Sequence, residues 1–440
     1  MTKLTIRWPD EHVERLEAAR GRLEIAGREL AARALNERTE CAAVILERWR
    51  DPGSPERKTL LDVHPQTSGF ARATLEAGLA LGLEPYTGDA LRAVVERELA
   101  PALASGARLA PFATTSLLLA GAIPMPALLQ ILLSLVVGSP LLVRPSARDR
   151  VSAEQVSLSI AAVDPELGRA VEIVDFPSDD LEAMTRFCAA PCVVASGDDE
   201  TIGAIRARLD PRQRFVAYAH RLSIAVAGDR ACLGDAGERL ARDLSLDVAL
   251  WDQLGCLSPT AVYVVGDDAD RAAQGVGGAL AAALAEREAA LPRGEIEPGI
   301  SGAIATARSE AEMRVAAGGA GGLYASAGTR WTVVVEPGSA WRASPLHRFV
   351  RVHAVPDAAA LRGALADVHG RLSSVALAGF EAGPRAGLEE VLAGLGASRF
   401  CAPGRMQAPE LGWHHDGMPI LTPLVGFADL PYGAYPNSSF

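Results

Sequence analysis

From residue 140 onward, short apolar runs alternate with helical patterns, and this alternation constrains the fold more than any other feature. Helical patterns at 152–163, 179–188 and 199–209 lie between the apolar runs. Strands that alternate with helices are typical of a parallel, doubly wound α/β sheet, the usual scaffold for binding a dinucleotide. The apolar runs that we predict as strands are 141–143, 170–176, 192–195, 215–218 and 223–227.

A second α/β unit is predicted to begin near residue 229. Its first helix, 236–254, has apolar residues on one face at helical spacing, and Gly255 is expected to end it. The alternation continues with strands at 261–265, 332–335 and 349–352 and helices at 269–290, 356–367 and 387–394. We predict four regions: a helical N-terminal region (1–110), a dinucleotide-binding domain (111–228), a catalytic domain (229–402), and a C-terminal segment (403–440) that returns to the cofactor domain or forms an oligomer interface.

Composition narrows the class of protein. The net charge of −11 is spread along 440 residues, so no basic stripe exists that would neutralise nucleic-acid phosphates. The six cysteines are scattered, which is unlike a disulfide scaffold, and Cys188 and Cys192 are interpreted as small buried hydrophobic residues. The first residues, MTKLTIRWPDEHVERL, lack the apolar core of a signal peptide. We therefore expect a cytoplasmic protein without a nucleic-acid partner.

Residues 117–143 carry no formal charge and are numerous enough to span a bilayer. Pro124, Pro126, Gly138 and Pro140 interrupt this stretch, which predicts a strand or loop, a short helix at 127–137, a turn and a strand. We expect a buried α/β unit and no stable membrane insertion.

Cys256 is the candidate nucleophile. It lies in WDQLGCLSPT, between the predicted helix 236–254 and the strand 261–265, where a loop can expose a thiol and still fix it. Backbone N–H groups of such a loop can stabilise an oxyanion next to the sulfur. Considered alone, one cysteine in an Ala- and Leu-rich chain is more often a buried structural residue.

Five segments, in order, resemble the LuxC-type long-chain acyl-CoA reductases, within the aldehyde dehydrogenase superfamily. One contains the run Q-x-x-C-x-S-P, which is Gln253, Cys256, Ser258 and Pro259 here, and another contains W-x-x-D-G, with Trp413, Asp416 and Gly417. The remaining matches are VVASGDDETIGAIR (193–206), FVAYAHRLSIAVAG (215–228) and SPLHRFVRV (344–352). The resemblance implies the aldehyde dehydrogenase fold, with two doubly wound α/β domains.

The resemblance also implies a reaction. The Cys256 thiolate would attack an acyl thioester, of CoA or of a carrier protein, and form an acyl-enzyme that a nicotinamide cofactor reduces to the aldehyde. The segment LLVRPSARDR is similar to the motif that meets the adenosine ribose. Ala147 stands where NAD-preferring members carry Glu, and Arg144, Ser146 and Arg148 lie beside it, so we expect NADPH, with NADH possible. Both arginines are equally consistent with solvated surface charges.

Ser196 and Gly197 precede a predicted helix, and their turn could face the pyrophosphate of the cofactor. The adjacent Asp198 and Asp199 would oppose a phosphate there, or could cap the helix.

The sequence departs from the family in two places. Ala122 occupies the position of an Asn whose amide helps to hold the oxyanion. The turn VAYAHRL lacks the carboxylate that acts as general base in hydrolytic aldehyde dehydrogenases, and His220 lies there instead. His220 is interpreted either as a proton donor or relay, or as a hydrogen-bonded structural residue.

Three functions remain open: reduction of an acyl thioester, NAD-linked oxidation of an aldehyde, and a noncatalytic role as a nucleotide-binding partner. The missing carboxylate argues against the second and the complete cysteine run against the third. The neighbouring His414, His415 and Asp416 are too close in sequence to hold one ion together, so no metal is expected. The resemblance implies a homodimer or homotetramer.

Overall fold

The computed structural model describes residues 11–318 and 321–429, which form two compact units. The first unit comprises residues up to Leu60, Tyr86–Ala219 and the segment from Pro419 onward, and the second comprises Leu61–Pro85 and His220–Met418. Helix α3 (Pro55–Val63) contains the first boundary between them. Each unit therefore contains segments that are distant in sequence.

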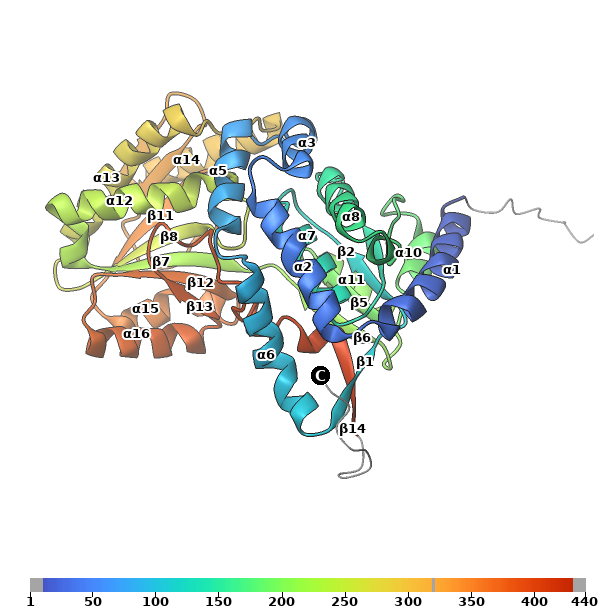
Figure 1. The fold of residues 1–440 in the computed structure, drawn as a ribbon. Coiled ribbons are helices and arrows are strands. Elements are labelled where there is room, and N and C mark those ends of the chain that lie inside the picture. The colour runs from blue at the N-terminus through green and yellow to red at the C-terminus, as the bar shows by residue number, and fades with distance from the viewer. Residues whose placement is uncertain (1–10, 319–320, 430–440) are drawn as a thin grey trace, which may run out of the picture. The chain divides into compact units, whose positions relative to one another are not determined.

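The first unit is built on a sheet of five parallel strands in the order β4-β3-β2-β5-β6. Figure 1 labels three of them, β2, β5 and β6. This is the order of a doubly wound dinucleotide fold, and the direction of winding reverses between β2 and β5. Its strands are β2 (Thr115–Leu118), β3 (Leu141–Arg144), β4 (Val171–Ile173), β5 (Cys192–Ser196) and β6 (Arg214–Tyr218), with β1 (Ala107–Pro111) and β14 (Val425–Asp429) in a separate ribbon. Its helices are α1 (Glu11–Ala32), α2 (Leu35–Arg50), α6 (Gly88–Ala104), α7 (Met125–Val136), α8 (Val151–Val163), α9 (Pro165–Gly168), α10 (Leu181–Phe187), α11 (Asp199–Arg206) and η4 (Thr422–Leu424).

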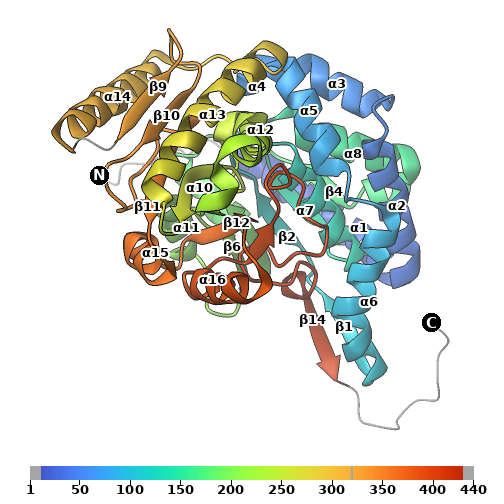
Figure 2. The same ribbon diagram turned by 90° about the vertical axis from the view of Figure 1, so that its left-hand side faces the viewer.

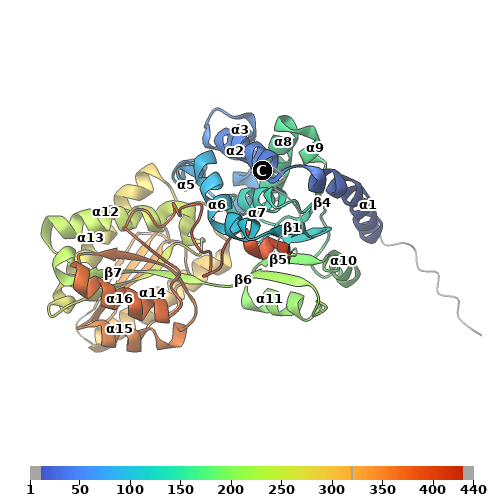
Figure 3. The same cartoon turned by 60° about the horizontal axis from the view of Figure 1, so that its bottom comes forward.

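Helices cover both faces of this sheet, because its strands are apolar on both sides. On one face, Leu118, Leu142 and Val193 pack with apolar residues of α1, α10 and α11. Helices α7 and α8 lie on the opposite face, as Figure 3 shows. Cys188 and Cys192 are buried, which confirms their interpretation as small hydrophobic residues, and burial raises the pKa of the Cys192 thiol to about 12.

A two-stranded antiparallel ribbon joins β1 and β14, whose Ala107 and Asp429 are paired across more than 300 residues of chain (Figure 2). The carboxylate of Glu98, on α6, accepts hydrogen bonds from the backbone N–H groups of Ile420, Leu421 and Thr422 at 2.8–3.2 Å. Residues 420–422 are thus fixed to α6, and residues 425–429 pair with β1.

The second unit has a sheet of seven strands in the order β13-β12-β7-β8-β11-β10-β9, parallel except for β9 at one edge. Its strands are β7 (Leu222–Gly228), β8 (Pro259–Val265), β9 (Gly322–Ala325), β10 (Thr332–Val335), β11 (Phe349–Val355), β12 (Leu372–Ala378) and β13 (Arg399–Cys401). Its helices are α4 (Pro65–Ser68), α5 (Arg72–Leu83), η1 (Asp229–Cys232), α12 (Gly234–Ala249), η2 (Leu250–Gln253), α13 (Ala269–Ala290), α14 (Pro298–Gly318), α15 (Ala358–Ala364), η3 (Ala366–Val368) and α16 (Ala382–Gly394).

Helices α12 and α13 cover one face of this sheet, and α15 and α16 cover the other (Figure 1). Alternate residues of each strand supply the two cores, so that Val262 and Val264 face α13 while Ala261 and Tyr263 face α15 and α16. Gly277 lies in α13 so close to β10 that a β-carbon there would come within 2.4 Å of Val335 Cγ2. This close packing explains the glycine at position 277 of the sequence GVGG.

The predicted fold class is confirmed, since both sheets are parallel in their centres and covered by helices on both faces. Two details of the prediction are wrong. The strand expected at 223–227 in the dinucleotide domain is β7, which pairs with β8 and β12 in the second unit. Helix α5, expected within the N-terminal region, also belongs to that unit, where it packs on Trp251.

The uncharged stretch 117–143 forms most of β2, the apolar helix α7 and β3, all of them buried in the first unit. Helix α7 has only 12 residues. Within residues 11–318 and 321–429, no helix combines the length and the apolar character that crossing a bilayer requires.

Candidate active site

Three neighbouring parallel strands of the second unit, β7, β8 and β11, begin at the same edge of the sheet. Cys256 lies in the loop that leads into β8, and His220 and Arg221 lie immediately before β7. The residues that precede β11 include Arg348. This edge therefore gathers three of the segments that the sequence analysis singled out.

All six cysteines fall within the described residues, and Cys256 alone is exposed. Its loop is fixed on both sides: the Ser223 hydroxyl, from β7, donates a hydrogen bond to the carbonyl oxygen of Cys256 at 2.6 Å. The backbone N–H of Ser258 donates to the carbonyl of Gly255 at 3.0 Å. The thiol is thus accessible on a rigid loop, as a nucleophile must be.

Three effects act on the pKa of the Cys256 thiol. Desolvation by the surrounding protein raises it, and the negative charge of Asp416 raises it further. The backbone N–H groups of Cys256 and Leu257 lower it, because they donate to the thiolate. The first two effects outweigh the third, so the pKa of the Cys256 thiol lies above its usual value.

The helix that precedes Cys256 is shorter than the sequence predicts. It ends at Ala249, and Trp251, Asp252 and Gln253 adopt left-handed backbone angles, with φ of 57°, 49° and 64°. We call these three residues the first left-handed turn. Non-glycine residues adopt this conformation at a cost of roughly 1–2 kcal/mol each, so neighbouring contacts must hold them there.

A second left-handed turn, Leu346–Arg348, supplies those contacts, with φ of 56–68°. The buried Arg348 guanidinium binds the Asp252 carboxylate at 2.6 and 3.0 Å. Gln253 accepts a hydrogen bond from the N–H of Phe349 at 2.9 Å and donates to the carbonyl of Pro259 at 2.8 Å. Gln253, which belongs to the predicted motif, therefore joins the starts of β8 and β11.

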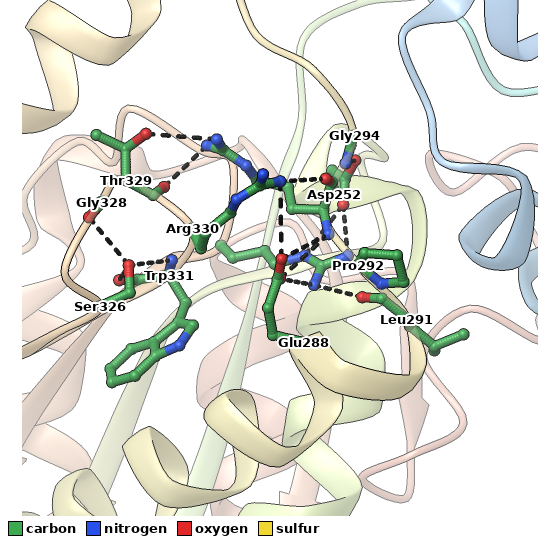
Figure 4. A network of polar contacts seen from close by, with 12 residues as sticks. Asp252, Glu288, Leu291, Pro292, Gly294, Ser326, Gly328, Thr329, Arg330 and Trp331 are labelled. Carbon is green, nitrogen blue, oxygen red and sulfur yellow. Dashed lines mark hydrogen bonds and ion pairs between the residues drawn. The ribbon is translucent and has the colours of Figure 1, made fainter.

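A polar network extends from the first left-handed turn to the end of α13 (Figure 4). Asp252 also accepts a hydrogen bond from the N–H of Gly294 at 3.0 Å. Arg348 reaches Glu288 at 2.8 Å and the carbonyl of Leu291 at the same distance. Burial raises the pKa of Asp252, and the charge of Arg348 opposes this effect. The network thus holds Asp252, four residues before Cys256, to the end of α13.

Residues 404–418 of the C-terminal segment pack on the same loop. Gln407 donates hydrogen bonds to the Ser258 hydroxyl and to the carbonyl of Asp247, both at 3.1 Å. The buried Asp247 carboxylate accepts hydrogen bonds from the N–H groups of Gly404 and Met406 at 2.6 and 3.0 Å. Ser258, the sixth position of the Q-x-x-C-x-S motif, therefore anchors this segment.

The W-x-x-D-G turn lies at the end of these residues. The indole of Trp413 stacks on the His415 ring, with 4.8 Å between centroids. The side chain of Asp416 is only 3% exposed, and its Oδ2 lies 3.6 Å from Arg221 Nε. The sequence analysis named Asp416 only as part of the W-x-x-D-G match, and it did not identify Arg221, although Arg221 adjoins His220.

His220 is exposed, and no hydrogen bond of its ring is found within the described part of the chain. The structure thus brings it to the same sheet edge as Cys256 without giving it a partner there. A role in proton transfer for His220 stays a prediction.

In the first unit, the carboxyl ends of β2 and β5 mark the point where the winding reverses, which is where dinucleotides bind in such sheets. Ser196 ends β5, and the Gln130 amide of α7 lies 3.5 Å from its hydroxyl. Gly197 follows, where a β-carbon would come within 3.1 Å of Thr201 Cγ2. Asp198 caps α11 by accepting from the N–H of Thr201 at 2.7 Å, so the capping role expected for it is confirmed.

Arg144 ends β3 as expected, but its guanidinium already has a structural contact. It donates two hydrogen bonds to the carbonyl of Phe176, at 2.9 and 3.2 Å, and lies over the Phe176 ring. Ser146 accepts a hydrogen bond from the N–H of Arg148 at 3.2 Å, which fixes the exposed turn that carries Ala147 and Arg148. Arg148 is thus more accessible than Arg144, the other arginine from which NADPH binding is expected.

Ala122 is buried in the loop between β2 and α7, at the same carboxyl edge. Pro124 and Pro126 flank Met125 at the start of α7, and prolines have no N–H to offer an anion. No side-chain amide in this loop replaces the missing Asn, because residues 119–126 contain none.

Comparison with known proteins places this geometry in a family. Residues 31–427 match the family model described as acyl-CoA reductase (LuxC). A long-chain acyl-protein thioester reductase 2 of Photobacterium leiognathi is 24% identical over 318 residues, which cover 70% of this chain and 62% of the relative. A long-chain acyl-protein thioester reductase of Aliivibrio fischeri is 25% identical over 322 residues, with the same shares. The chain thus matches less than two thirds of the length of either relative.

Solved structures share the fold at low sequence identity. Aldehyde dehydrogenase 21 from Physcomitrella patens aligns with a TM-score of 0.68 and 13% identity over 95% of this chain and 90% of that one. An oxidoreductase from Marinobacter aquaeolei aligns with a TM-score of 0.71 and 13% identity, over 96% of this chain and 91% of that one. The Δ-pyrroline-5-carboxylate dehydrogenase of Mycobacterium tuberculosis, bound with NAD, aligns with a TM-score of 0.66 and 14% identity, over 95% of this chain and 82% of that one. The predicted aldehyde dehydrogenase fold is confirmed.

Proposed function

Because the chain belongs to the acyl-CoA reductase (LuxC) family, we propose that it reduces an acyl thioester to the aldehyde through an acyl-enzyme on Cys256. The observation that carries the proposal is an exposed thiol on a loop that Ser223, Gln253 and Ser258 hold rigid. The backbone N–H groups of Cys256 and Leu257 donate to its thiolate and oppose the rise in its pKa.

The residues of the second unit perform the first half of this reaction. The Cys256 sulfur attacks the carbonyl carbon of the thioester, the bond from that carbon to the donor sulfur breaks, and the donor thiol leaves. The oxyanion of the intermediate needs hydrogen-bond donors, and Ala122 supplies none through its side chain. The backbone N–H groups beside the sulfur are the donors that we assign to it.

A nicotinamide dinucleotide is the cofactor that the first unit fits, because its five-stranded sheet has the winding order and switch point of dinucleotide folds. When bound, it supplies the hydride that reduces the acyl group. Ser196 and Gly197 lie at the switch point, and Ser146 and Arg148 lie beyond the end of β3. Ala147 leaves the position of the family's Glu without a carboxylate. Asp149, at the end of this turn, accepts a hydrogen bond from the N–H of Ser152 at 2.9 Å, and Asp175 is paired with Arg150 at 3.1 Å. We therefore propose NADPH, with NADH as the alternative.

Two acyl donors suit this chemistry, acyl-CoA and an acyl group on a protein. The relatives' names, long-chain acyl-protein thioester reductase, favour a long acyl chain on a protein, and the description of the family names acyl-CoA. Both present the same thioester carbon to Cys256. We also propose a homodimer or homotetramer, which light scattering of the purified chain measures.

The decisive experiment is mass spectrometry of the intact protein after exposure to acyl-CoA of graded chain length, and in a second arm to an acyl-protein. We expect a mass increase of one acyl group, its loss with formation of aldehyde when NADPH is added, and a weaker response to NADH. The adduct should be absent in Cys256→Ser and present in the control Cys401→Ser, which alters another cysteine of the same unit. An adduct that persists in Cys256→Ser would refute the proposal.

A third arm offers an aldehyde with NAD⁺ or NADP⁺ and no thiol acceptor. The proposed reductase should form little carboxylate under these conditions. Rapid formation of carboxylate would instead make aldehyde oxidation the activity of this site.

A further inference from the structure

Ser223, the second residue of β7, is a buried serine whose hydroxyl makes two hydrogen bonds. It accepts one from the backbone N–H of Ser374, on β12, at 3.1 Å. It donates the other to the carbonyl oxygen of Cys256 at 2.6 Å. A single hydroxyl group of β7 therefore connects β12 with the peptide group of the candidate nucleophile.

Both neighbours of β7 depart from regular pairing at Ser223. In β8, Thr260 is an extra residue between the partners of Ser223 and Ile224. In β12, Ser373 and Ser374 stand where a regular ladder has one residue. Such irregularities interrupt the backbone hydrogen bonds, redirect the chain, and are frequent next to active sites. At this interruption, the Ser223 hydroxyl bonds one backbone group from each neighbouring segment.

The hydrogen bond to Cys256 fixes the direction of a whole peptide group. The carbonyl of Cys256 and the N–H of Leu257 belong to one planar trans peptide, in which the two groups point in opposite directions. Because Ser223 holds the carbonyl, the N–H of Leu257 must point away from Ser223. This N–H is one of the two that donate to the Cys256 sulfur when it is ionised.

The same hydrogen bonds form a chain that begins in β12. The N–H of Ser374 donates to the Ser223 hydroxyl, which donates to the Cys256 carbonyl, and the N–H of Leu257 is the other end of that peptide group. Hydrogen bonds in such a chain polarise one another. A donor at the Cys256 carbonyl therefore makes the N–H of Leu257 a stronger donor as well as a better oriented one.

We propose that Ser223 is a positioning residue of this site: through the Cys256 carbonyl, it orients the N–H of Leu257 toward the oxyanion that forms when the sulfur attacks the thioester. This inference rests on the proposed function. Ser223 itself contacts neither the substrate nor the reacting atoms. Since Ala122 offers no side-chain donor, a backbone donor of fixed direction carries a larger share of the stabilisation of the oxyanion.

A merely structural role for Ser223 predicts a different result on mutation. If the hydroxyl only connects the strands, its loss leaves the N–H of Ser374 and the carbonyl of Cys256 without this partner. The protein then becomes less stable, while the chemistry of the folded protein stays the same. If the hydroxyl orients Leu257, the folded variant also reacts more slowly and binds the acyl carbonyl less strongly.

The first test measures the rate of acyl-enzyme formation from acyl-CoA by rapid-quench mass spectrometry. We expect Ser223→Ala to slow acylation about 10–10²-fold, because one donor loses its orientation. Ser223→Thr should keep most of the rate, and Ser223→Val, which has the same shape without the hydroxyl, should lose as much as Ser223→Ala. The matched control is Ser373→Ala, which removes a buried hydroxyl that has no hydrogen bond within the described residues and should leave the rate unchanged.

The second test is infrared spectroscopy of the acyl-enzyme, prepared from a thioester with ¹³C at the carbonyl carbon. Hydrogen bonds to the carbonyl oxygen weaken the C=O bond and lower its stretching frequency. We therefore expect the labelled band of Ser223→Ala to lie at a higher frequency than the band of the parent protein. The band of Ser373→Ala should match that of the parent protein.

Thermal unfolding shows which variants are folded, and the comparison of Ser223→Thr with Ser223→Val tests the hydroxyl independently of Ser223→Ala. A folded variant without the hydroxyl that keeps the acylation rate or the carbonyl band of the parent protein would overturn this inference, whatever its stability. That result would leave the proposed function intact. An acyl adduct that persists in Cys256→Ser would overturn the proposed function itself.

Discussion

At the scale of single residues, the site depends on polar side chains whose burial is compensated by backbone groups. Asp247 illustrates this dependence. It lies in α12, is fully buried, and holds the C-terminal segment through the N–H groups of Gly404 and Met406. Burial raises the pKa of Asp247 to about 7, although these two hydrogen bonds act to lower it. Its protonation state therefore affects the segment that also carries Asp416.

The raised pKa of Asp247 predicts a pH dependence of stability. Because the folded chain binds this proton more tightly than the unfolded chain, the contribution is fully present below about pH 4 and is lost as pH rises through about 7. The free energy of unfolding, relative to Asp247→Asn, should fall by up to about 4 kcal/mol over this range. Urea unfolding of both proteins at each pH measures the difference, and a difference that grows with pH would contradict the prediction.

At the scale of elements, two left-handed turns stabilise each other across 96 residues of sequence through Arg348 and Asp252. Neither turn is favourable alone, and each supplies the hydrogen bonds that the other lacks. Their contact aligns the starts of β8 and β11, and with them the loop of Cys256. The geometry of the nucleophile thus depends on residues far from it in sequence.

Replacing Arg348 should expose this dependence. Arg348→Met leaves the Asp252 carboxylate buried without its cation, which typically costs about 3–5 kcal/mol. We expect a loss of that size in urea unfolding, together with slower alkylation of Cys256 by iodoacetamide. The control Arg385→Met removes an exposed pair with Glu389 and should cost less than about 1 kcal/mol. Equal losses in the two variants would show that the buried pair is not required.

Helix α5 packs directly on the first left-handed turn through Gly78. A β-carbon at Gly78 would lie 2.6–2.8 Å from atoms of the Trp251 indole, closer than contact allows. Gly78→Ala should therefore destabilise the protein by about 1–3 kcal/mol, since a buried ring cannot move away freely. Gly302→Ala in α14, where nothing lies within 4 Å, should instead stabilise it by up to about 1 kcal/mol. Thermal unfolding shows whether each variant is more or less stable than the parent protein. A stabilised Gly78→Ala would contradict the packing of Gly78 on Trp251.

At the scale of the whole molecule, the chain leaves each unit and returns to it. Strand β14 completes the ribbon with β1, so unit 1 requires the pairing of segments more than 300 residues apart. The Glu98 carboxylate accepts hydrogen bonds from three successive N–H groups and so attaches residues 420–422 to α6.

Replacing Glu98 should weaken the pairing of β1 with β14. In Glu98→Ala three backbone donors lose a charged acceptor, and we expect a loss of about 2–3 kcal/mol and faster amide hydrogen exchange in β1 and β14. Glu96→Ala, one exposed residue of the same helix, serves as the control and should leave exchange unchanged. Exchange that stays slow in Glu98→Ala would mean that strand pairing alone holds the C-terminal segment.

The sequence by itself determined the fold class and the candidate nucleophile. Buried parallel strands need continuous apolar runs, so β3, β5 and β8 are visible as local patterns, and helix α13 was predicted with the bounds that the structure has. The run of Gln253, Cys256, Ser258 and Pro259 could be recognised because these residues lie within seven positions of one another in the sequence. These features depend on neighbours along the chain.

Only the tertiary structure decided which sheet β7 joins and which side chains surround Cys256. A strand pattern does not encode its partner, and the pairing of β7 with β8 and β12 depends on packing between distant segments. Trp251 continues an apolar helical pattern, yet hydrogen bonds from beyond residue 290 end that helix at Ala249. Ser374 lies 151 residues from Ser223 in sequence, and only the pairing of β12 with β7 brings its N–H to the Ser223 hydroxyl.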